Sequence, residues 1–242
     1  MPNPTAAILV IGDEILSGRT RDSNMHFLAN ELTRAGIDLK EARVVADEPD
    51  AIITALNALR ATHTHVFTSG GIGPTHDDIT ADCIAKAFGV GIDVRDDARA
   101  ILEERYKAMG TEVTEARLRM ARIPDTATLI ENPVSGAPGF TIGNVHVMAG
   151  VPAVFEAMVS SVLPGLTGGT PLMSQTYRVD RPEGDVAKEL GNLAARFPQL
   201  SIGSYPFIRE GAYGTNIVVR GHDSAAVDAA MIALAKLFPP ER

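Results

Sequence analysis

The segment richest in residues that could do chemistry is Thr68-Ser-Gly-Gly-Ile-Gly-Pro-Thr-His-Asp-Asp-Ile-Thr80. An apolar run leads straight into it, and a helix is predicted a few residues later. Glycines there let backbone N–H groups approach an anionic ligand, and the helix dipole adds partial positive charge. The alternative is an ordinary strand-to-helix turn capped by Asp78. Because the segment is richer than a turn requires, we expect a phosphate-binding loop made of Ser69, Gly70, Gly71, Gly73, Pro74, Thr75 and Thr80.

Acidic residues follow two other predicted strands. Gly12-Asp-Glu14 comes after the first strand, and Ala46-Asp-Glu48 closes the second. The carboxyl ends of parallel strands meet at one edge, where open α/β sheets bind ligands. We therefore expect Gly12 to contact the ligand and Asp13, Asp47 and Asp78 to surround one crevice. Such hard oxygen ligands suit Mg²⁺ or a similar divalent ion carrying a phosphate substrate, and the alternative is a solvated acidic turn.

Strands and helices must alternate to bring these loops together. Strands are predicted at residues 6–11, 39–46 and 65–68, and helices at about 22–35, 50–61 and 78–88. This order predicts a mostly parallel sheet with helices on both faces. Two helices at about 96–109 and 114–121, a strand at 145–148, the turn Gly150-Val-Pro152 and a helix at about 153–162 complete a first domain.

A linker divides the chain in two. Pro164-Gly-Leu-Thr-Gly-Gly-Thr-Pro171 is rich in glycine and proline, and the order of predicted elements changes after it. We predict an α/β domain at residues 1–165 and a small α+β domain with βαββα order at 171–242. A domain of that size is near the lower limit for independent stability, so we expect it to lean on the first domain or on a partner subunit.

Composition excludes several classes of function. The formal net charge is −8, which opposes general nucleic-acid binding. No stretch approaches the length of a membrane span and no signal peptide is evident, so we expect a cytoplasmic protein that binds no membrane. The single cysteine, Cys83, is predicted to be a core residue, and His63 and His65 to be structural. Arg117, Arg119 and Arg122 form the best basic patch to meet an anion, although a solvated helix face would look the same.

Four ordered motifs resemble one known group of proteins. Gly12-Asp-Glu, Gly70-Gly-Ile-Gly-Pro-Thr with Asp77-Asp-Ile-Thr, Asn132-Pro-Val-Ser-Gly-Ala-Pro-Gly-Phe140 and Gly150-Val-Pro152 are similar to motifs of the molybdopterin-binding-domain superfamily. The branch that matches best contains CinA and the N-terminal domain of eukaryotic FAD synthases. The resemblance covers about residues 6–163 and, more loosely, the small domain that follows in CinA-type proteins.

The resemblance implies a three-layer α/β/α sandwich with a mixed sheet. It also implies a ligand site formed by the Gly-Gly loop and two aspartates, Asp47 and Asp78, and a homo-oligomer. Members of this branch are similar to divalent-metal-dependent pyrophosphatases acting on ADP-ribose or FAD, with Mg²⁺, Mn²⁺ or Co²⁺ as the metal. Other members bind molybdopterin. We therefore expect either such a hydrolase or a non-catalytic binder of a phosphorylated nucleotide or pterin, and neither FAD-synthesising nor amidohydrolase activity within these residues.

Overall fold

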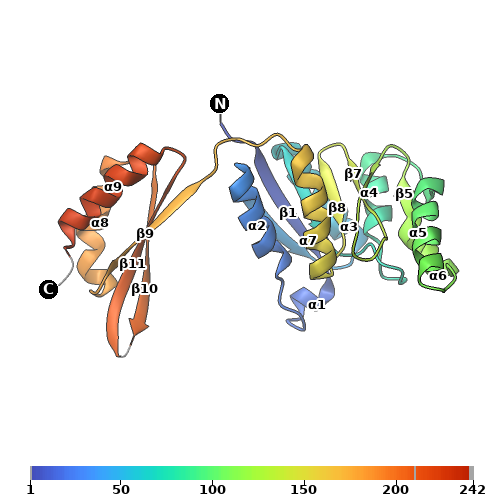
Figure 1. Ribbon diagram of the computed structural model, residues 1–242, viewed down its shortest axis with the longest axis horizontal. Helices are drawn as coiled ribbons and strands as arrows, with labels where there is room; N and C mark the ends of the chain where they lie inside the picture. The colour runs from blue at the N-terminus through green and yellow to red at the C-terminus, as the bar shows by residue number, and fades with distance from the viewer. Residues whose placement is uncertain (1, 210, 240–242) are drawn as a thin grey trace. The chain divides into compact units, whose positions relative to one another are not determined.

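Figure 1 shows the computed structural model, which describes residues 2–209 and 211–239. The chain divides into two compact units, Met1–Gly169 and Thr170–Arg242, and the boundary lies in the glycine-rich linker segment. Each unit has its own hydrophobic core, so each is described separately.

A six-stranded mixed sheet forms the centre of the first unit. The strand order is β2-β1-β3-β8-β7-β6. The first four strands run parallel, whereas β7 and β6 are antiparallel to their neighbours. The strands are β1 (Thr5–Ile11), β2 (Asp38–Val45), β3 (His65–Ser69), β6 (Thr128–Ile130), β7 (Gly139–Ile142) and β8 (Val145–Met148). The mixed, mostly parallel sheet predicted from the sequence is therefore confirmed.

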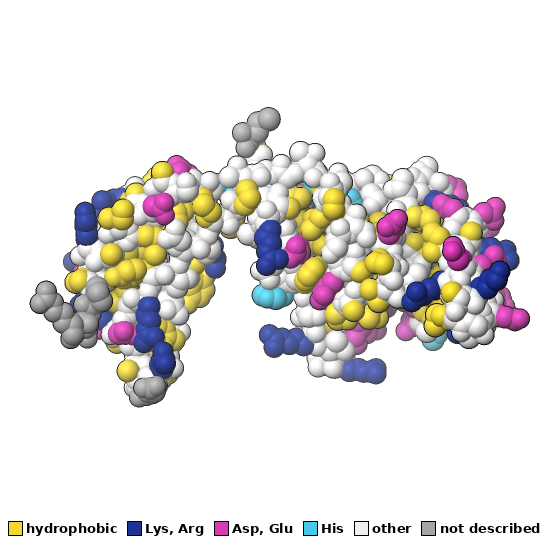
Figure 2. All heavy atoms as spheres, viewed as in Figure 1, with side chains coloured by type: hydrophobic (Ala, Val, Ile, Leu, Met, Phe, Trp, Pro, Cys, Tyr) yellow, Lys and Arg dark blue, Asp and Glu magenta, His cyan; other side chains and the backbone are white. Residues whose placement is uncertain are grey.

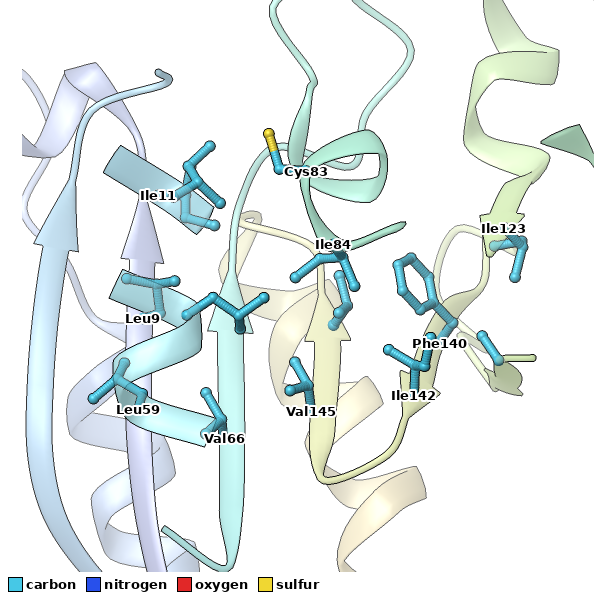
Figure 3. Close-up of a cluster of buried hydrophobic side chains, with 14 of the residues drawn as sticks. Leu9, Ile11, Leu59, Val66, Cys83, Ile84, Ile123, Phe140, Ile142 and Val145 are labelled. Carbon is cyan, nitrogen blue, oxygen red and sulfur yellow. The ribbon is translucent and has the colours of Figure 1, made fainter. Parts of the chain in front are cut away.

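Both faces of this sheet are covered, which explains why β1 is apolar throughout. Ala7, Leu9 and Ile11 pack into one core beneath α3 (Pro49–Thr62) and α4 (Thr80–Phe88), and the residues between them pack into a second core beneath α2 (Asn24–Ala35) and α7 (Pro152–Val162). Figure 3 shows the first core, where Leu9, Val66 and Val145 from three parallel strands point toward the helical layer. A strand buried on both faces needs such a continuous apolar run. The result is the expected three-layer sandwich.

Apart from α1, which was not predicted, the helices of the first unit lie close to their predicted positions. They are α1 (Asp13–Leu16), α2 (Asn24–Ala35), α3 (Pro49–Thr62), α4 (Thr80–Phe88), α5 (Asp96–Ala108), α6 (Glu115–Leu118) and α7 (Pro152–Val162), with 3-10 turns η1 (Arg119–Ala121) and η2 (Leu163–Gly165). Gly36 ends α2 in the left-handed conformation at φ 70°, which is the usual role of a glycine after a helix. The predicted helix at 114–121 is in fact α6 followed by η1.

Four short strands were not predicted. Besides β6 and β7, a separate two-stranded sheet pairs β4 (Ile92–Val94) with β5 (Arg122–Pro124). Each has only three or four residues, too few to show an alternating pattern, and each is defined by its partner strand.

The second unit has the predicted βαββα order. It consists of β9 (Met173–Val179), α8 (Glu183–Arg196), β10 (Ser201–Arg209), β11 (Ala212–Gly221) and α9 (Ser224–Leu237), with an antiparallel sheet in the order β10-β11-β9. Its core lies between this sheet and the two helices. Among the described residues of the whole chain, no helix is long and apolar enough to cross a membrane. On the face seen in Figure 2, acidic and basic side chains are intermixed over α5 and α6.

Candidate functional site

The loops after β1, β3 and β8 meet at the carboxyl edge of the parallel strands. At Gly70, which has φ 110°, an added Cβ would lie 2.2 Å from the carbonyl oxygen of Ile11. At Gly150, an added Cβ would lie 3.2 Å from Gly70 Cα. The three loops therefore pack backbone to backbone, and glycine at position 70 is required both by its φ angle and by this close approach.

The glycine loop presents backbone N–H groups at this edge. Within the described part of the chain, the amides of Gly71, Ile72 and Gly73 have no hydrogen-bond acceptor. Gly70 differs from our expectation, because its amide donates to the Met148 carbonyl oxygen at 3.1 Å and is not available to a phosphate. Thr80 begins α4 and fixes the other side of the loop, since its amide donates to the Gly71 carbonyl oxygen at 2.9 Å.

Asp78 shapes the loop rather than capping α4. Its Oδ2 accepts a hydrogen bond from the Thr75 amide at 2.8 Å and another from the Thr75 hydroxyl. The helix starts later than predicted, at Thr80, with Ile79 in the cap position and no side-chain cap. Arg119 strengthens this turn from outside, because its Nε donates to the Thr75 carbonyl oxygen at 3.1 Å. Pro74 and Thr75 are exposed at the turn.

Asp13 and Asp47 form an acidic pair joined by reciprocal hydrogen bonds. The Asp13 amide donates to Asp47 Oδ2 at 2.9 Å, and the Asp47 amide donates to Asp13 Oδ1 at 3.4 Å. Burial raises the pKa of Asp47 above its ordinary value, and the negative charges of Asp13, Glu14 and Asp77 raise it further, against the hydrogen bond from the Asp13 amide. The site therefore concentrates negative charge that a cation would relieve.

The three aspartates predicted as metal ligands do not form one preformed set. Across residues 2–209 and 211–239, no group of three or more His, Cys, Asp or Glu side chains is arranged to hold a metal ion. Asp13 and Asp47 are paired, whereas Asp78 is turned toward Thr75. From the glycine loop it is Asp77, exposed and next to Asp78, whose charge acts on Asp47. The acidic pair fits a magnesium-like ion that takes its other ligands from water and phosphate oxygens.

Asn24 belongs to the site and was missed. Its side chain is only 4% exposed, and its Nδ2 donates to both Ser69 Oγ and the Gly150 carbonyl oxygen at 2.8 Å. The sequence places it in Asp22-Ser-Asn, at the start of the helix predicted at about residues 22–35. Asp22 caps that start by accepting a hydrogen bond from the Met25 amide. The available signal was Asn24 itself, because it is a second polar residue at a helix start that Asp22 already caps.

Two pockets flank the glycine loop. One, the Asn24 pocket, is lined by residues that include Glu14, Arg21, Asn24, Ser69, Gly150 and Pro152. The other, the Arg119 pocket, is lined by residues that include Gly71, Gly73, Asp78, Arg119, Arg122 and Phe140.

The predicted arginine patch divides between two places. Arg119 and Arg122 face the glycine loop, and Arg122 forms an ion pair with Asp82. Arg117 instead stacks on the Tyr106 ring, with its guanidinium carbon 4.2 Å from the ring centroid. Cys83 lies in the core as predicted.

This sheet, with a glycine loop and an acidic pair at its carboxyl edge, defines an α/β domain of the molybdopterin-binding type. Residues 7–168 match the family model described as probable molybdopterin binding domain, and residues 171–242 match that of the FAD synthase middle domain. The chain belongs to the molybdopterin-binding domain family, which confirms the resemblance read from its motifs.

Relatives place the chain within that family. It is 32% identical over 262 residues to the probable FAD synthase of Caenorhabditis briggsae, covering 97% of this chain and 49% of that protein. The probable FAD synthase of Caenorhabditis elegans is also 32% identical, and the match covers 50% of it. The chain thus spans about half the length of these relatives. Among solved structures, the protein CinA of unknown function from Thermoplasma acidophilum is 35% identical, with a TM-score of 0.62 over 68% of this chain and 99% of that one.

Proposed function

We propose that the first unit is a divalent-metal-dependent hydrolase of a dinucleotide pyrophosphate of the ADP-ribose or FAD type. The observation that supports this most is the row of backbone amides without acceptors in the glycine loop, with the Asp13–Asp47 pair at the same edge. Backbone amides without a hydrogen-bond acceptor suit the oxygens of a pyrophosphate. The FAD synthase names of two relatives and the match of the second unit favour FAD or a related nucleotide.

Each part of the site would have its own role in the hydrolysis. The amides of Gly71, Ile72 and Gly73 donate to phosphate oxygens and stabilise the negative charge that develops on them. Water attacks one phosphorus atom, the bridging P–O bond breaks, and two phosphomonoesters leave. The proton that the water loses passes to the leaving phosphate oxygen. Asp78 holds the Thr75 turn in shape, which keeps the loop amides aligned.

Asp13 and Asp47 would hold the divalent ion. Mg²⁺ is typically bound by one or two carboxylates together with water and substrate phosphates, so a pair of aspartates is a sufficient protein contribution. The ion supplies Lewis-acid polarisation of the phosphate and charge neutralisation when it is bound.

A second candidate is a homo-oligomeric, non-catalytic binder of molybdopterin or a nucleotide. The lack of a three-residue metal set among the described side chains favours it, because binding through backbone amides needs no metal. Both candidates place the ligand at the glycine loop, and turnover distinguishes them.

A turnover screen tests the proposal. Purified protein is incubated with FAD, ADP-ribose and NAD in Mg²⁺, Mn²⁺ or Co²⁺, with EDTA as the control, and released AMP is measured. We expect metal-dependent AMP release from FAD or ADP-ribose. Tight binding of one nucleotide or of molybdopterin without product, with or without metal, would establish the binding function instead.

A further inference from the structure

Asn24 has a hydrogen-bonding pattern that packing alone does not explain. Its Nδ2 uses both hydrogens, one toward Ser69 Oγ and one toward the Gly150 carbonyl oxygen. Its Oδ1 is buried and has no hydrogen-bond partner among the described residues. A buried acceptor without a donor costs folding free energy, so a residue selected only for stability would not leave one here.

The carbonyl oxygen of Gly150 fixes which way the amide group faces. A carbonyl oxygen can only accept a hydrogen bond, so the atom of Asn24 that contacts it must be the NH₂ nitrogen. The same nitrogen donates to Ser69 Oγ. Oδ1 is thus held away from both contacts.

This arrangement determines the direction of the Ser69 hydroxyl. Ser69 Oγ accepts from Asn24, so its own hydrogen must point elsewhere, and the described residues provide no acceptor for it. Ser69 is 2% exposed and lines the Asn24 pocket directly before the glycine loop. Arg21 also lines this pocket, together with the carboxylates of Glu14 and Asp22.

We propose that Asn24 is a positioning residue that makes the Ser69 hydroxyl a hydrogen-bond donor to a phosphate oxygen of the bound ligand. This inference rests on the proposed function, because it places the phosphate at the glycine loop. Asn24 acts through Ser69, and through Gly150 it also ties the start of α2 to the loop after β8.

Two substitutions distinguish an effect on the direction of the Ser69 hydroxyl from an effect on packing. Asn24→Asp keeps the shape but puts an acceptor where the donor was, so the Ser69 hydrogen turns toward residue 24 and is lost to the ligand. Ser69→Ala removes the hydroxyl itself. Asn30→Asp, on the exposed part of the same helix, is the matched control for the added charge.

The measurement is calorimetric binding of FAD and ADP-ribose to the full chain carrying each change, with steady-state kinetics beside it. Each single substitution should weaken binding by about 10- to 100-fold, as expected for one hydrogen bond to a charged group. KM should rise by a similar factor while kcat changes little. The double variant should bind within about twofold of Ser69→Ala, because both changes remove the same hydrogen bond.

Other outcomes overturn the inference. Unchanged binding by either single variant, or a double variant that loses the product of the two effects, would show that Asn24 does not act through Ser69. If Asn24→Asp does not fold, Ser69→Ala alone decides, since it must weaken FAD binding and leave binding of unphosphorylated riboflavin unchanged. Wild-type binding without turnover would contradict the proposed hydrolysis alone, and no binding of either nucleotide would overturn both.

Discussion

His146 makes the stability of the first unit depend on pH. This histidine in β8 is 4% exposed, and its Nε2 lies 3.3 Å from Nδ1 of His65 in β3. Burial, together with the charge of His65, lowers the pKa of His146 from 6.5 to about 4. The folded protein therefore holds the His146 ring in its neutral form.

The direction and size of this pH effect on stability follow from the difference in the pKa of His146 between the folded and the unfolded chain. Below pH 6.5 the unfolded chain takes up a proton at His146, whereas the folded chain does not until about pH 4. Stability contributed by this group is complete above pH 6.5 and is lost as the pH falls toward 4. The loss should be about 2 kcal/mol by about pH 5 and about 3 kcal/mol at most. Burial also lowers the pKa of His65, so it acts with the same sign.

The assay is urea unfolding followed by circular dichroism between about pH 4.5 and pH 8. His146→Gln should flatten the dependence of the unfolding free energy on pH by about 2 kcal/mol between about pH 5 and pH 7. His26→Gln, which replaces an exposed histidine, serves as the control. If the His146→Gln profile ran parallel to that of the wild type, the burial argument would be refuted.

Three further predictions concern the loop, the acidic pair and the thiol. Gly71→Ala should destabilise the protein by about 1–3 kcal/mol more than Gly110→Ala in urea unfolding. Both glycines have φ +69°, but only at Gly71 would the new Cβ clash, 2.1 Å from a side-chain oxygen, so equal effects would contradict the steric argument. Asp47→Asn should leave the melting temperature equal or higher. Burial and like charges raise the pKa of Asp47, so its ionised form destabilises the fold at neutral pH. A clear fall in melting temperature would show instead that the carboxylate stabilises the fold. Cys83 should react with a thiol reagent at about pH 8 only after unfolding, since burial raises the pKa of its thiol to about 11, and rapid labelling of the native protein would contradict that.

The sequence predicted those parts of the fold that have strong local signals. The uninterrupted apolar run of β1 predicted a strand covered on both faces, and Gly36 marked the end of α2. β6 and β7 lacked such signals, because strands of three or four residues show no periodicity. The sequence also did not predict the His65–His146 contact, because these residues are 81 positions apart and only the strand order brings them together.

The site was predicted at the level of loops but not of side-chain direction. Asp13 and Asp47 were expected at one edge because each follows a parallel strand, and they are hydrogen-bonded there. The sequence could not tell how two adjacent aspartates would be oriented, and the structure turns Asp78 toward Thr75. Asn24 was overlooked because its partners come from loops far along the chain.

The most direct test of the proposed function is the metal dependence of AMP release by the wild type and Asp47→Asn, measured side by side on FAD and ADP-ribose. Asp38→Asn, a change in an acidic residue of the same strand region, is the matched control. The proposed chemistry predicts EDTA-sensitive release by the wild type and by the control, and a loss of at least about 100-fold in Asp47→Asn without loss of folding. Equal turnover by Asp47→Asn, or none by the wild type with any divalent metal, would contradict it.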